Sequence, residues 1–272
     1  MNLSTRRRHP LAGLVVVLLG LLVAGGLYSA FAPASADDSS SDTELIAAGR
    51  QLFVVGCSSC HGLNAEGIVE KNGTNYGPPL LGVGAAAVDF QVGTGRMPMA
   101  RPDTQAPKKT PVYNDEEVAA LAAYVASLSP GPSVPSAADV DPSDADVAAG
   151  FQLFLTNCTA CHNYGGAGGA LRDGRYAPNL YDVSAQHIWE AMVTGPQNMP
   201  VFSNAVITPQ DKRDLIAYVQ TLQDQTSYGG SSLGSRGPVT EGLFGWLVGI
   251  GSLVLVAVWI ANNGTRASKK AT

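Results

Sequence analysis

The segment AAGRQLFVVGCSSCHG fills residues 47–62, and a second segment, AAGFQLFLTNCTACHN, fills residues 148–163. The two align without a gap at an offset of 101 residues. Three further blocks recur in the same order: YGPPL with YAPNL, GRMP with QNMP, and AYVASL with AYVQTL (residues 76–80 with 176–180, 95–98 with 197–200, and 123–128 with 217–222). Four blocks repeated in one order indicate a duplicated domain, with about 85 residues in each copy.

The four cysteines of the chain all lie in one repeated string, Cys-x-x-Cys-His. Its members are Cys57, Cys60 and His61 in the first copy, and Cys158, Cys161 and His162 in the second. This string is the attachment signature of c-type haem. Two thiols one helical turn apart can reach both vinyl groups at one porphyrin edge, and the adjoining imidazole can bind the iron. The sequence therefore predicts two covalently bound haem c groups, which would also fill the core of two small domains.

Three other interpretations of the cysteine pairs remain open. A structural zinc site requires two Cys-x-x-Cys pairs about 15–20 residues apart, whereas these pairs are about a hundred residues apart. A thioredoxin-like redox pair accompanies a βαβ pattern, which this sequence lacks. Two simple disulfides in an exported domain are the third alternative. The repetition of the complete pentapeptide at equivalent places favours haem over all three.

The second axial ligand of each iron is expected far down the chain. Met97 follows His61 by 36 residues, Met199 follows His162 by 37, and each methionine precedes a proline. A thioether opposite histidine raises the iron's potential, which suits electron transfer. Met99 is a rival for Met97 but has no counterpart in the second copy, and we expect Met192 to fill the core.

The sequence predicts that both copies of the repeated domain are mostly helical. Apolar residues at helical spacing predict helices over 43–55 and 146–156. Asn114 has Glu117 at the third helical position and should cap a helix that runs through Leu128. Thr208 followed by Pro209 should start the last helix of the second copy. No convincing hairpin or alternating strand is found. Residues 129–144 read as a Pro-rich linker, the glycine run 165–169 as a flexible loop, and residues 227–238 as a flexible tether.

Two apolar segments predict attachment to a membrane. Residues 243–261 form 19 uncharged residues, enough to cross a hydrocarbon core of about 30 Å as a helix. Basic residues follow this segment, which places the C-terminus in the cytoplasm by the positive-inside rule (Arg266, Lys269 and Lys270). A buried soluble helix is the alternative. Residues 11–31 follow Arg6, Arg7 and Arg8, and read equally as a retained helix or as a signal peptide cleaved near residues 34–36. Either alternative exports the repeats.

The charge distribution excludes one class of partner. The net charge is −5, and all 22 acidic residues lie between Asp37 and Glu241, where only 11 of the 17 basic residues are found. A nucleic-acid-binding protein needs a basic face, so nucleic acid is not an expected partner. His187 has no evident partner in the sequence and is expected to be structural. With two of four histidines assigned to haem, no separate copper or zinc centre is expected.

Both copies resemble class I cytochrome c domains, which share the N-terminal helix, the Cys-x-x-Cys-His string, a Pro-x-Leu segment, a Met-Pro loop and a C-terminal helix. In that family the terminal helices cross through a glycine and aromatic contact, which here implies Gly49, Phe53 and Tyr124, and in the second copy Gly150, Phe154 and Tyr218. The family's proline carbonyl that fixes the proximal histidine corresponds to Pro78 and Pro178.

The whole chain resembles the dihaem cytochrome cc subunits of actinobacterial menaquinol–cytochrome c reductases. The fold class is then all-α, with two cytochrome c domains, a C-terminal transmembrane helix and an N-terminal apolar helix. The expected segments are a signal or anchor (1–36), domain 1 (43–129), a linker (130–143), domain 2 (144–226), a tether (227–242), a membrane helix (243–261) and a cytoplasmic tail (262–272).

This resemblance also implies a function. The chain would carry electrons from a Rieske iron–sulfur centre through its first and second haems to a cytochrome c oxidase, beside a cytochrome b subunit in the plasma membrane, with both haem domains outside. Catalysis would belong to the reductase complex, since the chain itself performs no bond chemistry. The alternatives are an anchored dihaem subunit of another oxidase or of a dehydrogenase, and a dihaem peroxidase, which would need an open iron in one copy.

Overall fold

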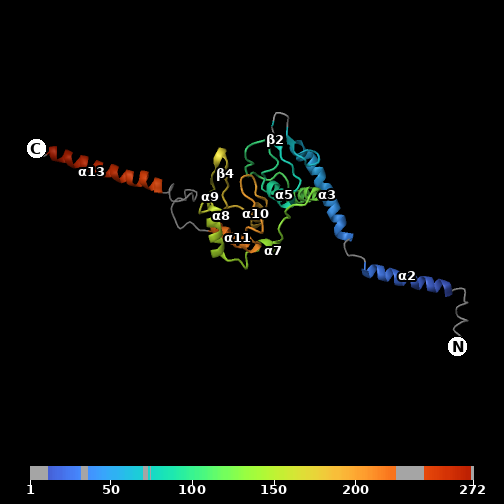
Figure 1. Ribbon diagram of the computed structural model, residues 1–272. Coiled ribbons are helices and arrows are strands. Elements are labelled where there is room, and N and C mark those ends of the chain that lie inside the picture. The colour runs from blue at the N-terminus through green and yellow to red at the C-terminus, as the bar shows by residue number, and fades with distance from the viewer. Residues whose placement is uncertain (1–11, 32–35, 70–72, 74, 225–241, 271–272) are drawn as a thin grey trace.

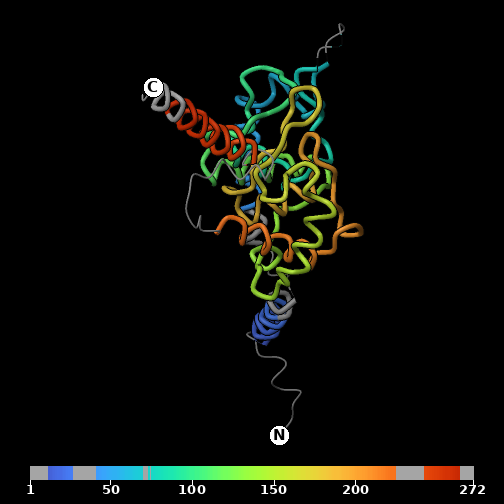
Figure 2. The backbone as a smooth tube through the Cα atoms, turned by 90° about the vertical axis from the view of Figure 1, so that its left-hand side faces the viewer, coloured from blue at the N-terminus to red at the C-terminus, as the bar shows by residue number. Residues whose placement is uncertain are grey.

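The computed structural model describes residues 12–31, 36–69, 73, 75–224 and 242–270. Two helical domains lie against each other, and the apolar helices α2 (Ala12–Phe31) and α13 (Gly251–Lys270) stand away from them (Figure 1). In the view turned by 90°, the green tube of the first domain and the yellow and orange tube of the second remain in contact (Figure 2). The mostly helical architecture with two domains confirms the predicted fold class.

The first domain is built on the crossing of its long helices, α3 (Ala36–Gly56) and α6 (Asp115–Leu128). They meet at Gly49, where a side chain would overlap the Ala120 carbonyl and lie 2.9 Å from the Tyr124 Cβ. Beside this contact the rings of Phe53 and Tyr124 pack with their centroids 5.2 Å apart. The glycine and aromatic contact implied by the family resemblance is therefore present.

The second domain repeats this arrangement with α8 (Val147–Asn157) and α11 (Pro209–Gln223). Gly150 lies against the Asp214 carbonyl, and the Phe154 and Tyr218 rings are 5.2 Å apart. The short helices α4 (Ser58–His61) and α9 (Thr159–His162) carry the ends of the two Cys-x-x-Cys-His strings. Each haem string therefore follows directly from a helix that is anchored in its own domain core.

The predicted helix starts are confirmed. The Asn114 side chain accepts a hydrogen bond from the Glu117 amide, and the Glu117 carboxylate accepts one from the Asn114 amide. Thr208 and Asp211 form the same reciprocal pair at the start of α11, with Pro209 in the first turn. Each pair satisfies amides that have no partner within the helix.

The structure contains two helices and two hairpins that were not predicted from the sequence. Helices α5 (Gly84–Gly93) and α10 (Ala185–Thr194) precede the methionine loops. The expectation of no hairpin is wrong, because antiparallel pairs follow both haem strings: β1 (Ile68–Val69) with β2 (Asn75–Gly77), and β3 (Gly169–Ala170) with β4 (Tyr176–Ala177). Strands of two or three residues are too short to display alternation.

The linker between the domains is packed against both of them. Its helical turn α7 (Ala137–Val140) is capped by Ser136 and contacts α10 and α11. Upstream, the Pro132 carbonyl accepts a hydrogen bond of 3.1 Å from the Ala86 amide of α5. The Pro-rich segment therefore contacts both domains and links them by packing as well as by the chain.

Among the described residues, one helix is long and apolar enough to cross a membrane, Gly242–Asn263. It includes the π-helical segment η2 (Gly245–Ile250) and the first part of α13, and none of its apolar stretch is buried in the protein. The alternative of a buried soluble helix is therefore wrong. Helix α2 confirms the expected N-terminal apolar helix. The basic residues 6–8, residues 34–35 of the expected cleavage site and the tether lie outside the described residues, except Gly242.

Candidate haem sites

The two histidines of the haem strings are oriented in the same way. The His61 Nδ1 donates a hydrogen bond of 2.8 Å to the Pro78 carbonyl, and the His162 Nδ1 donates one of 3.0 Å to the Pro178 carbonyl. The carbonyl only accepts, so Nδ1 carries the proton and Nε2 keeps the free lone pair that iron needs. Burial lowers the pKa of His162, against the opposing effect of the Pro178 hydrogen bond, and favours this neutral form.

The loop after each histidine brings the proline into place. The Gly67 amide donates to the His61 carbonyl at 2.7 Å, and the Gly168 amide donates to the His162 carbonyl at 2.9 Å. Both glycines have a positive φ, and a side chain at Gly168 would collide with the Ala177 carbonyl. Residues 165–169, expected to be a flexible loop, form a hydrogen-bonded turn that ends in strand β3.

The cysteines are not paired with one another. All four are free thiols in the structure, with Cys161 the most exposed. Burial raises the pKa of Cys57 and of Cys158 to about 11, and the second cysteine of each pair adds to the effect. A thioredoxin-like pair needs a lowered thiol pKa. The free thiols give no support to the disulfide interpretation, and their burial disfavours the redox pair.

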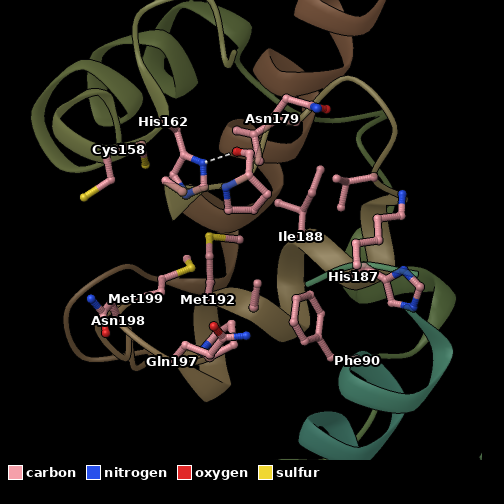
Figure 3. A pocket seen from close by; sticks show the side chains of 18 of the residues that line it. Phe90, Cys158, His162, Asn179, His187, Ile188, Met192, Gln197, Asn198 and Met199 are labelled. Atoms are coloured by element: carbon pink, nitrogen blue, oxygen red, sulfur yellow. Dashed lines mark hydrogen bonds between the residues drawn. The ribbon is translucent and has the colours of Figure 1, made fainter. Parts of the chain in front are cut away.

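A cavity opens beside His162 in the second domain. Its empty volume, including the part open to solvent, is about 1360 Å³, and its wall contains Cys158, Cys161, His162 and Met199. Figure 3 shows His162 on one side, with the sulfur atoms of Met199 and Met192 on the other. Met192 is buried in the core cluster, as expected, yet its sulfur also faces the cavity. The structure therefore brings together the predicted donors of one haem site and adds Met192 as a second thioether.

In the first domain, Met97 packs against the buried core cluster that includes Phe53 and Tyr124, and Cys57 packs against the same cluster. The Met97 amide donates a hydrogen bond of 2.9 Å to the Gln91 carbonyl at the end of α5. Met99 is partly exposed and is not among the residues of this cluster. Of these two methionines, Met97 therefore packs against the core of domain 1 and Met99 does not.

The first domain supplies part of the wall of the second domain's cavity. Its contribution comprises Phe90, Thr94, Arg96, Gln105 and Lys108. Arg96 is 8% exposed, its guanidinium lies 4.7 Å from the centre of the Phe90 ring, and it makes no ion pair within the described part of the chain. The Nε of Arg175, also in this wall, is buried without a hydrogen-bond partner.

This wall fits haem c. The group carries two propionates. The buried Arg96 guanidinium and the buried Nε of Arg175 have no anionic partner among the described residues and are suited to bind carboxylates. The cavity also offers two thiols, a neutral imidazole and two thioethers as ligands. Its interior is otherwise apolar, as a porphyrin ring requires. Sequence reasoning missed Arg96 and Arg175 as wall residues. The sequence does contain one signal for this role. Arg96 is a cation in the methionine loop of the first copy, at the position where the second copy has the neutral Asn198.

His187, expected to be structural, has partners that the sequence did not reveal. Its Nε2 lies 3.6 Å from the Asp89 Oδ1 of the first domain, and its ring packs edge-on against Phe90 with centroids 6.0 Å apart. Residues from two domains make these contacts, so they could not be read from the local sequence.

Comparison with known proteins agrees with this geometry. The "Cytochrome c" family model matches residues 46–129, and the model "Cytochrome C oxidase, cbb3-type, subunit III" matches residues 145–219. The cytochrome bc1 complex cytochrome c subunit of Corynebacterium diphtheriae is 42% identical, over 94% of this chain and 95% of its own length. The subunit of the same name from Mycobacterium tuberculosis H37Rv is 43% identical, over 94% and 92%.

The chain belongs to the family of cytochrome bc1 complex cytochrome c subunits. Two cytochrome c domains imply covalently bound haem c and electron transfer as the activity of the chain. A more distant relative, the cbb3-type cytochrome c oxidase subunit FixPc of Rhizobium leguminosarum, is 32% identical over 50% of this chain and 45% of its own length. That likeness is partial, whereas the bc1 subunits match almost from end to end.

Proposed function

We propose that this chain carries electrons from a Rieske iron–sulfur subunit, through domain 1 and then domain 2, to a cytochrome c oxidase. Each haem, when bound, supplies an iron that takes up and releases one electron. We assign Cys57, Cys60, His61 and Met97 to the first haem, and Cys158, Cys161, His162 and Met199 to the second. The corresponding domains are residues 43–129 and 144–226.

The observation that carries this proposal is the position of Arg96. It directly precedes Met97, the proposed iron ligand of domain 1, and it lines the cavity that contains His162 in domain 2. Phe90 from domain 1 lines the same cavity. A residue next to the proposed ligand of domain 1 thus forms part of the domain 2 cavity wall. We infer that the two haem sites share this wall, which favours electron transfer from one domain to the other.

The remaining residues hold this path at the membrane. We propose that the helix Gly242–Asn263 spans the plasma membrane with the C-terminus in the cytoplasm, since Arg266, Lys269 and Lys270 follow its apolar part. Both haem domains then lie outside, beside a cytochrome b subunit and the Rieske subunit. Domain 2 is adjacent to the membrane helix in sequence, and we assign to it the contact with the oxidase.

A pair of haem-attachment variants tests the order of transfer in the complex purified with mild detergent. With Cys158 and Cys161 both changed to alanine, quinol should still reduce the c-type haem of domain 1, while the a-type haem of the oxidase stays oxidised. With Cys57 and Cys60 changed instead, neither the remaining c-type haem nor the a-type haem should be reduced. Reduction of the domain 2 haem in that second variant would overturn the order.

A second measurement identifies the partners of the chain by the haem types that copurify with it. A reduced-minus-oxidised visible spectrum of the wild-type preparation should contain b- and a-type signals beside the c-type signal. A c-type signal alone in every gentle preparation would contradict the assignment to a quinol reductase joined to an oxidase. It would move the proposal to an anchored carrier for a dehydrogenase.

A further inference from the structure

Helices α5 and α10 meet at the domain interface and bring three metal-binding side chains together. Asp89 comes from α5, while His187 and Glu190 lie three residues apart on α10 and therefore on one helix face. One ligand atom from each lies within 4.8 Å of the other two. Figure 3 shows His187 beside Phe90, and both residues line the haem cavity. Asp89 and Glu190 are not among the residues of that wall, so the cluster borders the candidate haem site through His187 alone.

Glu190 has the environment of an incomplete ligand. Its side chain is fully buried. Its Oε1 accepts a hydrogen bond of 3.1 Å from the Gln186 side-chain amide, and its Oε2 has no hydrogen-bond partner in the described part of the chain. The same Gln186 amide donates a hydrogen bond of 2.9 Å to the Asp89 Oδ1. Two carboxyl groups are therefore held side by side, and one of their oxygens is buried without a donor. An arrangement of this kind needs a proton or a cation between the two groups.

The donor set selects the ion. Calcium and magnesium prefer oxygen ligands alone, whereas zinc binds imidazole nitrogen together with carboxylate oxygen. The Asp89 and His187 side chains are 17% and 23% exposed, so the cluster is not closed off from solvent. Three protein ligands would leave the fourth tetrahedral position of zinc to water.

We propose that Asp89, His187 and Glu190 form a Zn²⁺ site that joins the two cytochrome domains. The site takes one ligand from domain 1 and two from domain 2, so a bound ion stabilises the arrangement in which the haem sites share a wall. Gln186 positions both carboxylates through its two hydrogen bonds. This inference does not depend on the direction of electron transfer.

Calorimetric titration of the chelator-treated, haem-loaded full chain in detergent with ZnCl₂ tests the site. We expect one Zn²⁺ per chain and a loss of affinity of roughly tenfold or more in Asp89→Asn and in Glu190→Gln. The matched control is Asp182→Asn, because Asp182 also faces the other domain, through Lys108, but lies outside the cluster. Its affinity should equal that of the wild type.

A second readout separates zinc binding from mere packing. Because the Glu190 and Asp89 carboxyl groups are held side by side, a proton shared between them must leave when zinc enters. Titrations in buffers of different ionisation enthalpy should show about one proton released by the wild type and none by Glu190→Gln. No binding at a one-to-one ratio, or unchanged affinity in both variants, would overturn the proposal and leave a shared proton between the carboxyl groups.

Discussion

Gln105 of the first domain and Tyr176 of the second exchange two hydrogen bonds. The Gln105 Nε2 donates to the Tyr176 carbonyl at 2.7 Å, and the Tyr176 amide donates to the Gln105 Oε1 at 2.9 Å. The side-chain amide thus pairs with strand β4 as a neighbouring strand would. Tyr176 lies two residues before Pro178, which orients His162. A loop of domain 1 therefore supports the segment that fixes the candidate iron ligand of domain 2.

Replacing Gln105 tests this support. In Gln105→Ala both hydrogen bonds are lost, and the stability of the interface should fall by about 1–2 kcal/mol. The Tyr176 amide should then exchange its hydrogen faster than in the wild type, as measured by hydrogen exchange with mass spectrometry. Gln152→Ala, at an exposed site on α8, is the control and should leave that exchange unchanged.

The axial methionines can be separated by substitution. Met199→Ala should abolish the weak sulfur-to-iron absorption band of one haem, and Met97→Ala should abolish that of the other. Met192→Ala and Met99→Ala should keep both bands, because Met192 occupies the α10 position that matches Gln91 in α5 and has no methionine counterpart. Loss of a band in Met192→Ala, with retention in Met199→Ala, would reassign the ligand.

Gly150 provides a test of the helix crossing. An added methyl group would overlap the Asp214 carbonyl, so Gly150→Ala should lower the free energy of unfolding of domain 2 by about 1–3 kcal/mol. Thermal unfolding followed by circular dichroism measures the change. Ala148→Ser, on the exposed face of the same helix, should unfold like the wild type. Equal stability of the two variants would show that the helices can separate at no cost.

Features set by nearby residues could be predicted from the sequence. The caps at Asn114 and Thr208 depend on partners three residues away, and the haem strings are local as well. The pairing of helices at Gly49 and Gly150 became predictable only through the family resemblance. Helix α5 lacks a polar cap, since its N-cap is Val83. The domain interface was not predictable, because Asp89 and Gln186 are 97 residues apart and meet only once both domains have folded.

Arg96 should tune the haem of the other domain. A positive charge at the cavity wall favours the reduced, less positive iron, so Arg96→Gln should lower the midpoint potential of the domain 2 haem. A charge interaction of about 1 kcal/mol corresponds to about 40 mV for a one-electron couple. Spectroelectrochemical titration measures both haems. The exposed Arg172→Gln is the control, and equal shifts in both variants would remove the specific role of Arg96.

The stability of the second domain should depend on pH through Glu190. Its pKa is raised from 4.5 to about 9, first by burial and then by the Asp89 charge. A raised pKa means that the folded state binds the proton more tightly than the unfolded state does. The stabilisation is therefore fully present below about pH 4.5 and is lost as the pH rises through about 9.

Chemical denaturation of the zinc-free protein at a series of pH values checks this expectation. Between pH 6 and pH 9 the wild-type unfolding free energy should decline. Glu190→Gln, which imitates the protonated carboxyl, should flatten that decline. Asp211 caps α11 at the surface, so Asp211→Asn should lower stability at every pH in this range without changing the slope. A Glu190→Gln profile parallel to the wild type would show that Glu190 is ionised in the folded protein, which would require a cation or another donor at its buried oxygen.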